Sequence, residues 1–274
     1  MPIIILLSDS YEKGKEIAKK TADKLDYKYV DRHILGGIAK QYDIPESKLI
    51  KALDDMPSLL GMSSKTWHQY LAYIQEGTFK ELLDDKVVCY GLAAHLYVLG
   101  VSHVMKVRIT MDAEKMAKEI AAKEGVSIEK AYKIYKQQIK FRKKWSMNAF
   151  NIDETDLSHY DLVINLSQID DEEAVDMIAE ATTYRKFQPM TYSIRCLHDR
   201  ELASRVRTVL LEKFPEVMVS ATNGTVVIQI RALKREKQKK AQIIKELVGN
   251  LPGVNYVEVH IINDIFRQAI ETFR

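Results

Sequence analysis

The sequence predicts an α/β protein: a parallel sheet flanked by helices, followed by a small αββαβ domain. Two observations support this prediction. The first is that apolar runs of strand length alternate with runs of helical periodicity, because a helix that returns the chain to a neighbouring parallel strand produces this alternation. The second is Asn223-Gly224 between two β-branched runs, which predicts a hairpin because both turn positions need positive φ.

The first part of the chain contains five predicted strands with helices between them. Apolar spacing and turn residues set the limits of each element. We expect Asp112 and Ser127 to cap helices and Gly125 to end one. The predicted strands span 3–7, 27–30, 86–90, 104–109 and 161–165, and the predicted helices begin near 13, 31, 44, 92, 112, 127 and 171.

The pattern changes near Pro189, which indicates a linker in the sequence. We therefore divide the chain into a domain at 1–186, a linker at 187–196, a second domain at 197–262 and a tail at 263–274. The second domain has predicted helices at 199–214 and 233–248, strands at 217–221, 225–230 and 256–262, and an amphipathic tail helix at 264–273.

Composition excludes several classes of protein. The chain has 274 residues, of which 46% are hydrophobic, so it has enough apolar content for a real core. Cys89 and Cys196 fit no metal spacing, and the seven histidines form no HxxxH or HxH pair, so we expect free thiols in a reducing cytoplasm and no metal site built from protein ligands alone. The apolar start is too short for a signal peptide or a membrane span.

The net charge of +3 is unevenly distributed. Residues 191–274 carry 14 Lys and Arg against 9 Asp and Glu, so attraction to anionic surfaces is expected mainly in the C-terminal part. The basic residues lack interleaved aromatic residues, and no nucleic-acid reading motif is present. We therefore expect no nucleic-acid partner.

The stretch from Ile3 to Ala18 has the layout of a phosphate-binding loop with part of its chemistry missing. Such a loop has a glycine, four residues and Gly-Lys-Ser/Thr, because backbone N–H groups and the lysine bind phosphate while the hydroxyl holds Mg²⁺. Gly14 and Lys15 fit this register, whereas Asp9 and Glu16 do not. An ordinary strand-to-helix turn is the alternative interpretation.

Several further segments occur in an order and spacing that carry a resemblance. They are 14–20, 27–32, 87–91, 127–131, 140–142 and 160–167. With them, residues 1 to about 186 resemble the cytidylate kinase-like branch of the P-loop nucleoside-monophosphate kinases. The resemblance implies a P-loop kinase-like fold, ATP and Mg²⁺ as cofactors, and a CMP-type acceptor.

The resemblance also implies roles for individual residues. Lys15 and Arg142 would be catalytic, the latter as a lid arginine stabilising the transferring phosphoryl group. Asp31 and Arg32 would shape the acceptor nucleotide site. The residues implied for the ATP phosphates are Gly14, Lys15, Lys13 and Ser10.

The departures from the family pattern are as informative as the matches. Bulky or charged Tyr11, Glu12 and Lys13 stand where small residues are expected. Leu92 replaces the arginine of a Gly-Arg-Gly sequence, and Ile139 replaces the aspartate that begins the lid motif. One positioned arginine contributes roughly 10³–10⁵ to the rate of phosphoryl transfer, so several losses make fast catalysis difficult.

Residues from about Leu197 to Ile262 resemble a BON domain. The matching features are 217–219, Gly224 and the closing Leu251-Pro-Gly-Val254 with Val257. The resemblance implies a protein partner or an anionic phospholipid surface as the binding partner. The lysines of the 233–248 helix suit such a surface, while the alternative is that they only solvate the helix.

Three hypotheses follow from these features. The first is an active kinase that transfers the ATP γ-phosphoryl to a nucleoside monophosphate. The second is a catalytically inactive kinase-fold protein, a pseudoenzyme that acts as a nucleotide sensor or a scaffold. The third is a membrane-surface or protein-interaction adaptor that works through the BON-like domain. The tail at 264–273 is expected to pack either on its own domain or on a second subunit, which would give a homo-oligomer.

Overall fold

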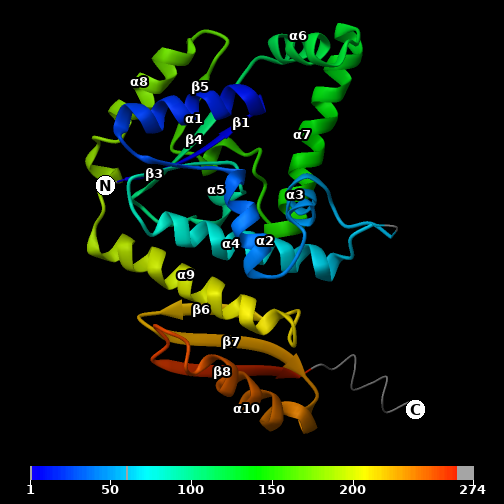
Figure 1. The fold of residues 1–274 in the computed structure, drawn as a ribbon, viewed down its shortest axis with the longest axis vertical. Coiled ribbons are helices and arrows are strands. Elements are labelled where there is room, and N and C mark those ends of the chain that lie inside the picture. The colour runs from blue at the N-terminus through cyan, green and yellow to red at the C-terminus, as the bar shows by residue number, and fades with distance from the viewer. Residues whose placement is uncertain (1, 60, 264–274) are drawn as a thin grey trace.

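A five-stranded parallel sheet forms the centre of the N-terminal unit (Figure 1), in the order β2-β3-β1-β4-β5. The computed structural model describes residues 2–59 and 61–263. The predicted parallel sheet is confirmed, with β1 between β3 and β4 at its centre. The strands are β1 (Ile3–Ser8), β2 (Lys28–Val30), β3 (Val87–Tyr90), β4 (Val104–Thr110) and β5 (Leu162–Asn165).

Helices cover both faces of this sheet, so its central strand is apolar on both sides. Ile4 and Leu6 of β1 pack under α1 (Tyr11–Leu25) and α8 (Asp171–Ala181). Ile3 and Ile5 face the other core. The helices on that second face are α2 (Leu35–Gln41), α3 (Glu46–Asp54), α4 (Ser64–Leu82) and α5 (Ala94–Tyr97), with a 3₁₀ turn, η1 (Arg32–Ile34), before α2.

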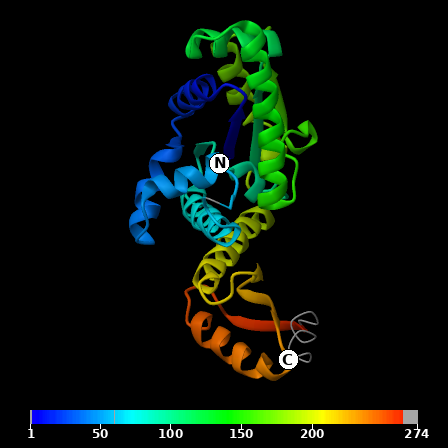
Figure 2. The ribbon, with the colours of Figure 1, turned by 90° about the vertical axis from the view of Figure 1, so that its right-hand side faces the viewer.

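Helix α7 (Ile128–Phe150) runs along one side of the sheet, and α6 (Ala113–Glu124) lies across its upper end (Figures 1 and 2). Gly125 ends α6 with φ of 66°, and the Ser127 hydroxyl accepts a hydrogen bond from the Lys130 amide, as predicted. Asp112 occupies the N-cap position of α6, as predicted, but its side chain makes no capping hydrogen bond and accepts one from the Asn165 side-chain amide instead.

The C-terminal unit is a three-stranded mixed sheet in the order β6-β7-β8, with two helices packed on one face. Asn223 and Gly224, with φ of 51° and 78°, form the predicted hairpin turn. The strands are β6 (Met218–Thr222), β7 (Thr225–Ala232) and β8 (Tyr256–Asn263), and the helices are α9 (Thr191–Leu211) and α10 (Lys237–Val248). Short 3₁₀ turns are η2 (Leu157–His159), η3 (Arg185–Phe187) and η4 (Lys234–Glu236).

Helix α9 joins the two units. It begins at Thr191 and not at 199, so most of the expected linker at 187–196 is helical. Leu197 belongs to the core around α4, whereas Leu202 and Val206 belong to the core of the C-terminal sheet. The domain limits at 1–186 and 197–262 remain a prediction, and the predicted tail helix at 264–273 lies outside the described residues.

Within residues 2–59 and 61–263, none of the helices combines the length and the apolar character that crossing a membrane requires.

Candidate functional site

The connection between β1 and α1 is the first place to look for a phosphate site, and it contains only Asp9 and Ser10. Helix α1 begins at Tyr11, two residues earlier than predicted, so Gly14 and Lys15 lie inside its first turns. The Gly14 amide donates a hydrogen bond to the Ser10 carbonyl, at 3.0 Å, as in a continuous helix. The stretch therefore has the shape of a strand-to-helix turn.

The space beneath this turn is filled by side chains. A Cβ atom on Gly14 would lie 2.6 Å from Tyr90 Oη and would also collide with Ser8 Cβ. The Tyr90 hydroxyl donates a hydrogen bond to the Tyr11 carbonyl oxygen at 2.8 Å. Close packing against Tyr90 and Ser8 therefore requires a glycine at this position.

The two lysines predicted to bind phosphate are engaged by carboxylates. Lys13 Nζ donates to Asp171 of α8 at 2.6 Å, and this hydrogen bond raises the lysine pKa. Lys15 Nζ lies 3.3 Å from Asp31. Burial alone would raise the Asp31 pKa, but hydrogen bonds from His33, Tyr29 and Lys15 outweigh it and bring the pKa to about 2. Asp31 is therefore ionised and held in place.

A cavity of about 610 Å³ opens at the carboxyl ends of β1, β3 and β4. Open parallel sheets bind their ligands at this edge. Leu7, Tyr90 and Arg108 reach it from the three strands, while α7 forms its opposite wall. Of the seven predicted site residues, Arg32 and Arg142 line this cavity, and Ser10, Lys13, Gly14, Lys15 and Asp31 do not.

Three arginines line the cavity, and each has a carboxylate partner. Arg32 makes two hydrogen bonds to Asp54, of 2.9 and 2.6 Å. Arg142 makes two to Glu154, of 2.5 and 2.9 Å. Arg108 donates to Asp9, which also accepts from the Tyr135 hydroxyl at 3.3 Å. We refer to this cavity as the paired cavity because its three arginines are each neutralised.

The partners differ in burial, and this decides which pair can open. Glu154 is buried, at 2% exposure of its side chain, whereas Asp54 is 47% exposed. Burial alone would raise the Glu154 pKa, but its contacts with His95 and Arg142 lower the pKa to about 2. Burial lowers the pKa of His95, whose Nε2 lies 3.3 Å from Glu154. At neutral pH the Glu154 carboxylate is therefore charged and His95 neutral.

The backbone beside the cavity is strained. Gly91, Leu92 and Ala93 are successive left-handed residues, with φ of 71°, 56° and 58°. This conformation costs a non-glycine residue about 1–2 kcal/mol. The hydroxyl of Ser8, another lining residue, is buried and has no hydrogen-bond partner among the residues that the structure describes. Strain and an unsatisfied donor are typical of a binding site.

Sequence reasoning missed Arg108, Glu154 and Asp54. A signal existed for Arg108, because an arginine inside the apolar run of a central strand requires a partner or a ligand. No comparable signal exists for Asp54 and Glu154, which lie in segments rich in charge.

The residues present do not fit ATP and Mg²⁺ in the arrangement that the loop motif implies. The first turn of α1 occupies the place of the loop, and Lys15 binds Asp31. Glu16 stands where the motif has a metal-binding hydroxyl. Among the described residues, 2–59 and 61–263, no group of three or more His, Cys, Asp or Glu side chains is arranged to hold a metal ion.

A five-stranded parallel sheet flanked by helices, with a cavity at the strand ends that Arg32 of η1 and Arg142 of α7 line, is the architecture of a kinase-like α/β protein. Residues 3–168 match the sequence profile of the Cytidylate kinase-like family, and the chain belongs to that family.

Individual relatives are more distant. A cytidylate kinase from Pyrococcus horikoshii is 37% identical over 65 residues, which are 23% of this chain and 33% of that protein, so the match spans a third of the relative's length. An uncharacterised protein from Eubacterium ventriosum is 20% identical, with a TM-score of 0.48 over 68% of this chain and 100% of that chain. Shikimate kinase from Bacteroides thetaiotaomicron is 11% identical, with a TM-score of 0.42 over 67% and 99%.

Proposed function

We propose that this chain is a nucleotide-binding member of the Cytidylate kinase-like family that binds a CMP-type ligand in the paired cavity without transferring a phosphoryl group. The observation that carries the proposal is the start of α1 at Tyr11. Phosphoryl transfer depends on positioned donors around the γ-phosphate of ATP. A helical turn closed by the Tyr90 hydroxyl leaves no loop to supply them.

The acceptor side of the cavity retains the groups that a nucleotide needs. Arg32 is the arginine best placed to bind its phosphate, because its partner Asp54 is half-exposed and an exposed ion pair contributes only about 0–1 kcal/mol. A phosphate would replace the Asp54 carboxylate in the same two-point geometry. Tyr11, whose ring lies under the Arg32 guanidinium at 5.5 Å, offers an aromatic surface beside that phosphate.

Titration calorimetry with CMP tests this proposal. We expect saturable binding to the wild-type chain and a loss of affinity of about tenfold or more in Arg32→Gln, since a hydrogen bond to a charged group contributes about 1.5–3 kcal/mol. Lys15→Ala is the matched control and should bind CMP as the wild type does. Equal affinity of Arg32→Gln and the wild type would refute the assignment, and no CMP binding at all would support a scaffold.

A second candidate function uses the C-terminal unit as an adaptor. Its order α9-β6-β7-α10-β8 agrees with the αββαβ arrangement expected of a BON-like domain. Lys239 and Lys245 on α10 are exposed and suit an anionic lipid surface. Co-sedimentation with vesicles containing phosphatidylserine at low salt tests this role, and absence of binding would exclude its lipid version.

A further inference from the structure

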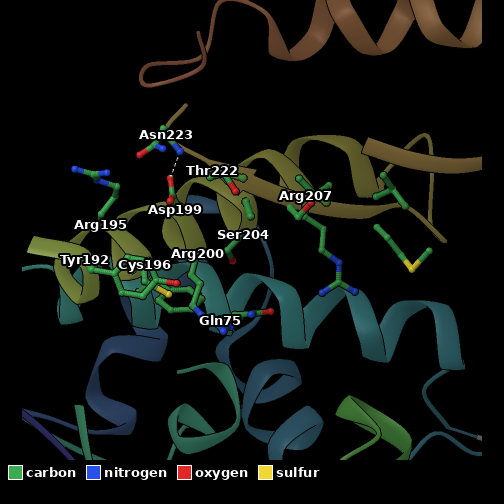
Figure 3. A pocket seen from close by; sticks show the side chains of 17 residues that line it. Gln75, Tyr192, Arg195, Cys196, Asp199, Arg200, Ser204, Arg207, Thr222 and Asn223 are labelled. Carbon is green, nitrogen blue, oxygen red and sulfur yellow. Dashed lines mark hydrogen bonds between the residues drawn. The ribbon is translucent and has the colours of Figure 1, made fainter. Parts of the chain in front are cut away.

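A second cavity, of about 620 Å³, lies between α4, α9 and β6, where the N-terminal and C-terminal units meet (Figure 3). Its lining residues from α9 and β6 lie beyond residues 3–168, the segment shared with the family. Phe79, Val217 and Ala221 supply apolar surface. We refer to it as the junction cleft.

One face of α9 presents three hydrogen-bonding side chains to this cleft. Arg200, Ser204 and Arg207 are spaced at i, i+4 and i+7, and Figure 3 shows all three on the side of α9 that faces α4. The Ser204 side chain is 5% exposed, and its hydroxyl has no hydrogen-bond partner within the described part of the chain. Buried polar groups without partners are rare in folded proteins.

The two arginines are also incompletely satisfied. Arg200 donates to the carbonyl oxygens of Tyr97, at 3.1 Å, and Leu99, but its buried Nε–H has no partner among the described residues. Arg207 is half-buried, and this burial lowers its pKa. Within residues 2–59 and 61–263, neither arginine has a carboxylate within ion-pair distance. Both arginines are half-buried, and a half-buried guanidinium without a carboxylate partner is suited to bind an anion.

The acidic residue that lines the cleft does not supply this charge. The Asp199 carboxylate accepts a hydrogen bond from the Asn223 amide at 2.8 Å, which fixes it to the hairpin turn at one end (Figure 3). Arg195 lies at the same end, so it partly offsets Asp199. The side of α9 that carries Arg200, Ser204 and Arg207 therefore stays positive.

We propose that the junction cleft binds a small anionic ligand whose phosphate or carboxylate group is held by Arg200, Ser204 and Arg207. Arginine donates hydrogen bonds and accepts none, so its partner must be rich in acceptor oxygens. The volume lies within the roughly 300–1,000 Å³ of small-molecule sites, and the apolar wall fits a ligand with an organic body. This site is separate from the paired cavity and does not depend on its proposed ligand.

Calorimetric titration of the full chain with inorganic phosphate, and separately with citrate, tests the proposal at fixed ionic strength. Both titrations use the Arg32→Gln background, in which binding in the paired cavity is weakened, so that the effect of a second substitution reports on the junction cleft. We expect saturable binding of at least one anion. Binding of phosphate would indicate a ligand with a phosphate group, and binding of citrate a ligand with carboxylate groups. Arg207→Gln should weaken that binding by about tenfold or more, and Ser204→Ala by less.

Arg231→Gln is the matched control, because Arg231 is an exposed arginine of β7 outside the cleft. It should leave anion affinity unchanged. Circular dichroism melting checks that Arg207→Gln is folded, and Arg207→Lys, which keeps the charge, should retain part of the affinity. Absence of saturable binding by both anions, or equal weakening in Arg231→Gln and Arg207→Gln, would overturn the proposal.

Discussion

The paired cavity and the junction cleft have similar volumes, but they differ in whether their arginines have carboxylate partners. In the paired cavity each arginine has a carboxylate partner, and Glu154 is fully buried against Arg142. In the junction cleft Arg200 and Arg207 have no carboxylate partner among the described residues. The short helix α5 contacts both regions, through His95 beside Glu154 and through the Tyr97 carbonyl beside Arg200.

This difference teaches that a positive side chain in a cavity is not by itself a binding site. A paired arginine is already satisfied, so a ligand must first displace its carboxylate, and only the exposed Asp54 is easily displaced. A half-buried arginine without a carboxylate partner can bind an anion without first losing an ion pair. The two sites should therefore differ in stability, in acid sensitivity and in tolerance of substitution.

The largest expected difference is in stability. Arg142→Gln leaves the buried Glu154 charge without its partner and should lower the free energy of unfolding by about 3–5 kcal/mol. Arg207→Gln removes a charge that has no carboxylate partner in the described structure, and should change stability by about 1 kcal/mol or less, in either direction. Urea denaturation measures both, and equal losses would contradict the contrast.

Low pH should remove the stabilisation that the ionised Glu154 contributes in the paired cavity, and it should have no such effect at Arg207 in the junction cleft. The Glu154 pKa falls from 4.5 to about 2 on folding, so its contribution is present above pH 4.5 and is lost as the pH falls towards 2. At 1.36 kcal/mol per pKa unit this amounts to roughly 3 kcal/mol. Asp31, lowered from 3.8 to about 2, adds in the same direction.

Urea denaturation between pH 6 and pH 2 tests this dependence. Glu154→Gln should flatten the loss of stability with falling pH, whereas Arg207→Gln should retain the wild-type slope. A wild-type slope in Glu154→Gln would show that another group causes the acid sensitivity.

A smaller effect tests whether the edge of the paired cavity is closed. Gly14→Ala places a methyl group against Tyr90 and Ser8, and overpacking of this kind costs about 1–3 kcal/mol. Gly37→Ala is the control, because a Cβ there meets nothing within 4 Å inside α2, and it should stabilise the protein by about 0.5–1 kcal/mol. Stabilisation by both substitutions would indicate an open loop beneath α1.

The sequence was sufficient for the fold because local patterns determine it. Alternating apolar runs, Gly125, Ser127 and the Asn223-Gly224 turn each specify an element, and the structure has those elements. The start of α1 was predicted too late because Gly14-Lys15 was placed by analogy with a loop. No turn is imposed by Tyr11, Glu12 and Lys13. The hydroxyl of Tyr90, which is far along the chain, donates a hydrogen bond to the Tyr11 carbonyl oxygen and so holds the start of the helix in place.

The candidate site was predictable only in part. Arg32 and Arg142 came from the resemblance, and both line the paired cavity. Their partners depend on where α3, α7 and the segment after α7 meet, as does the contact between Arg108 and Asp9, which are 99 positions apart. Pairing of this kind depends on tertiary packing, and local sequence patterns do not show which distant residues come into contact.

A coupled assay of ADP release from ATP and Mg²⁺ tests most directly whether the protein transfers a phosphoryl group. It would be run with CMP, dCMP and the other common monophosphates, for the wild type and for Lys15→Ala. Because α1 fills the place of the phosphate loop and Lys15 binds Asp31, we expect no turnover that depends on Lys15. Turnover that Lys15→Ala abolishes would contradict it and would establish an active kinase.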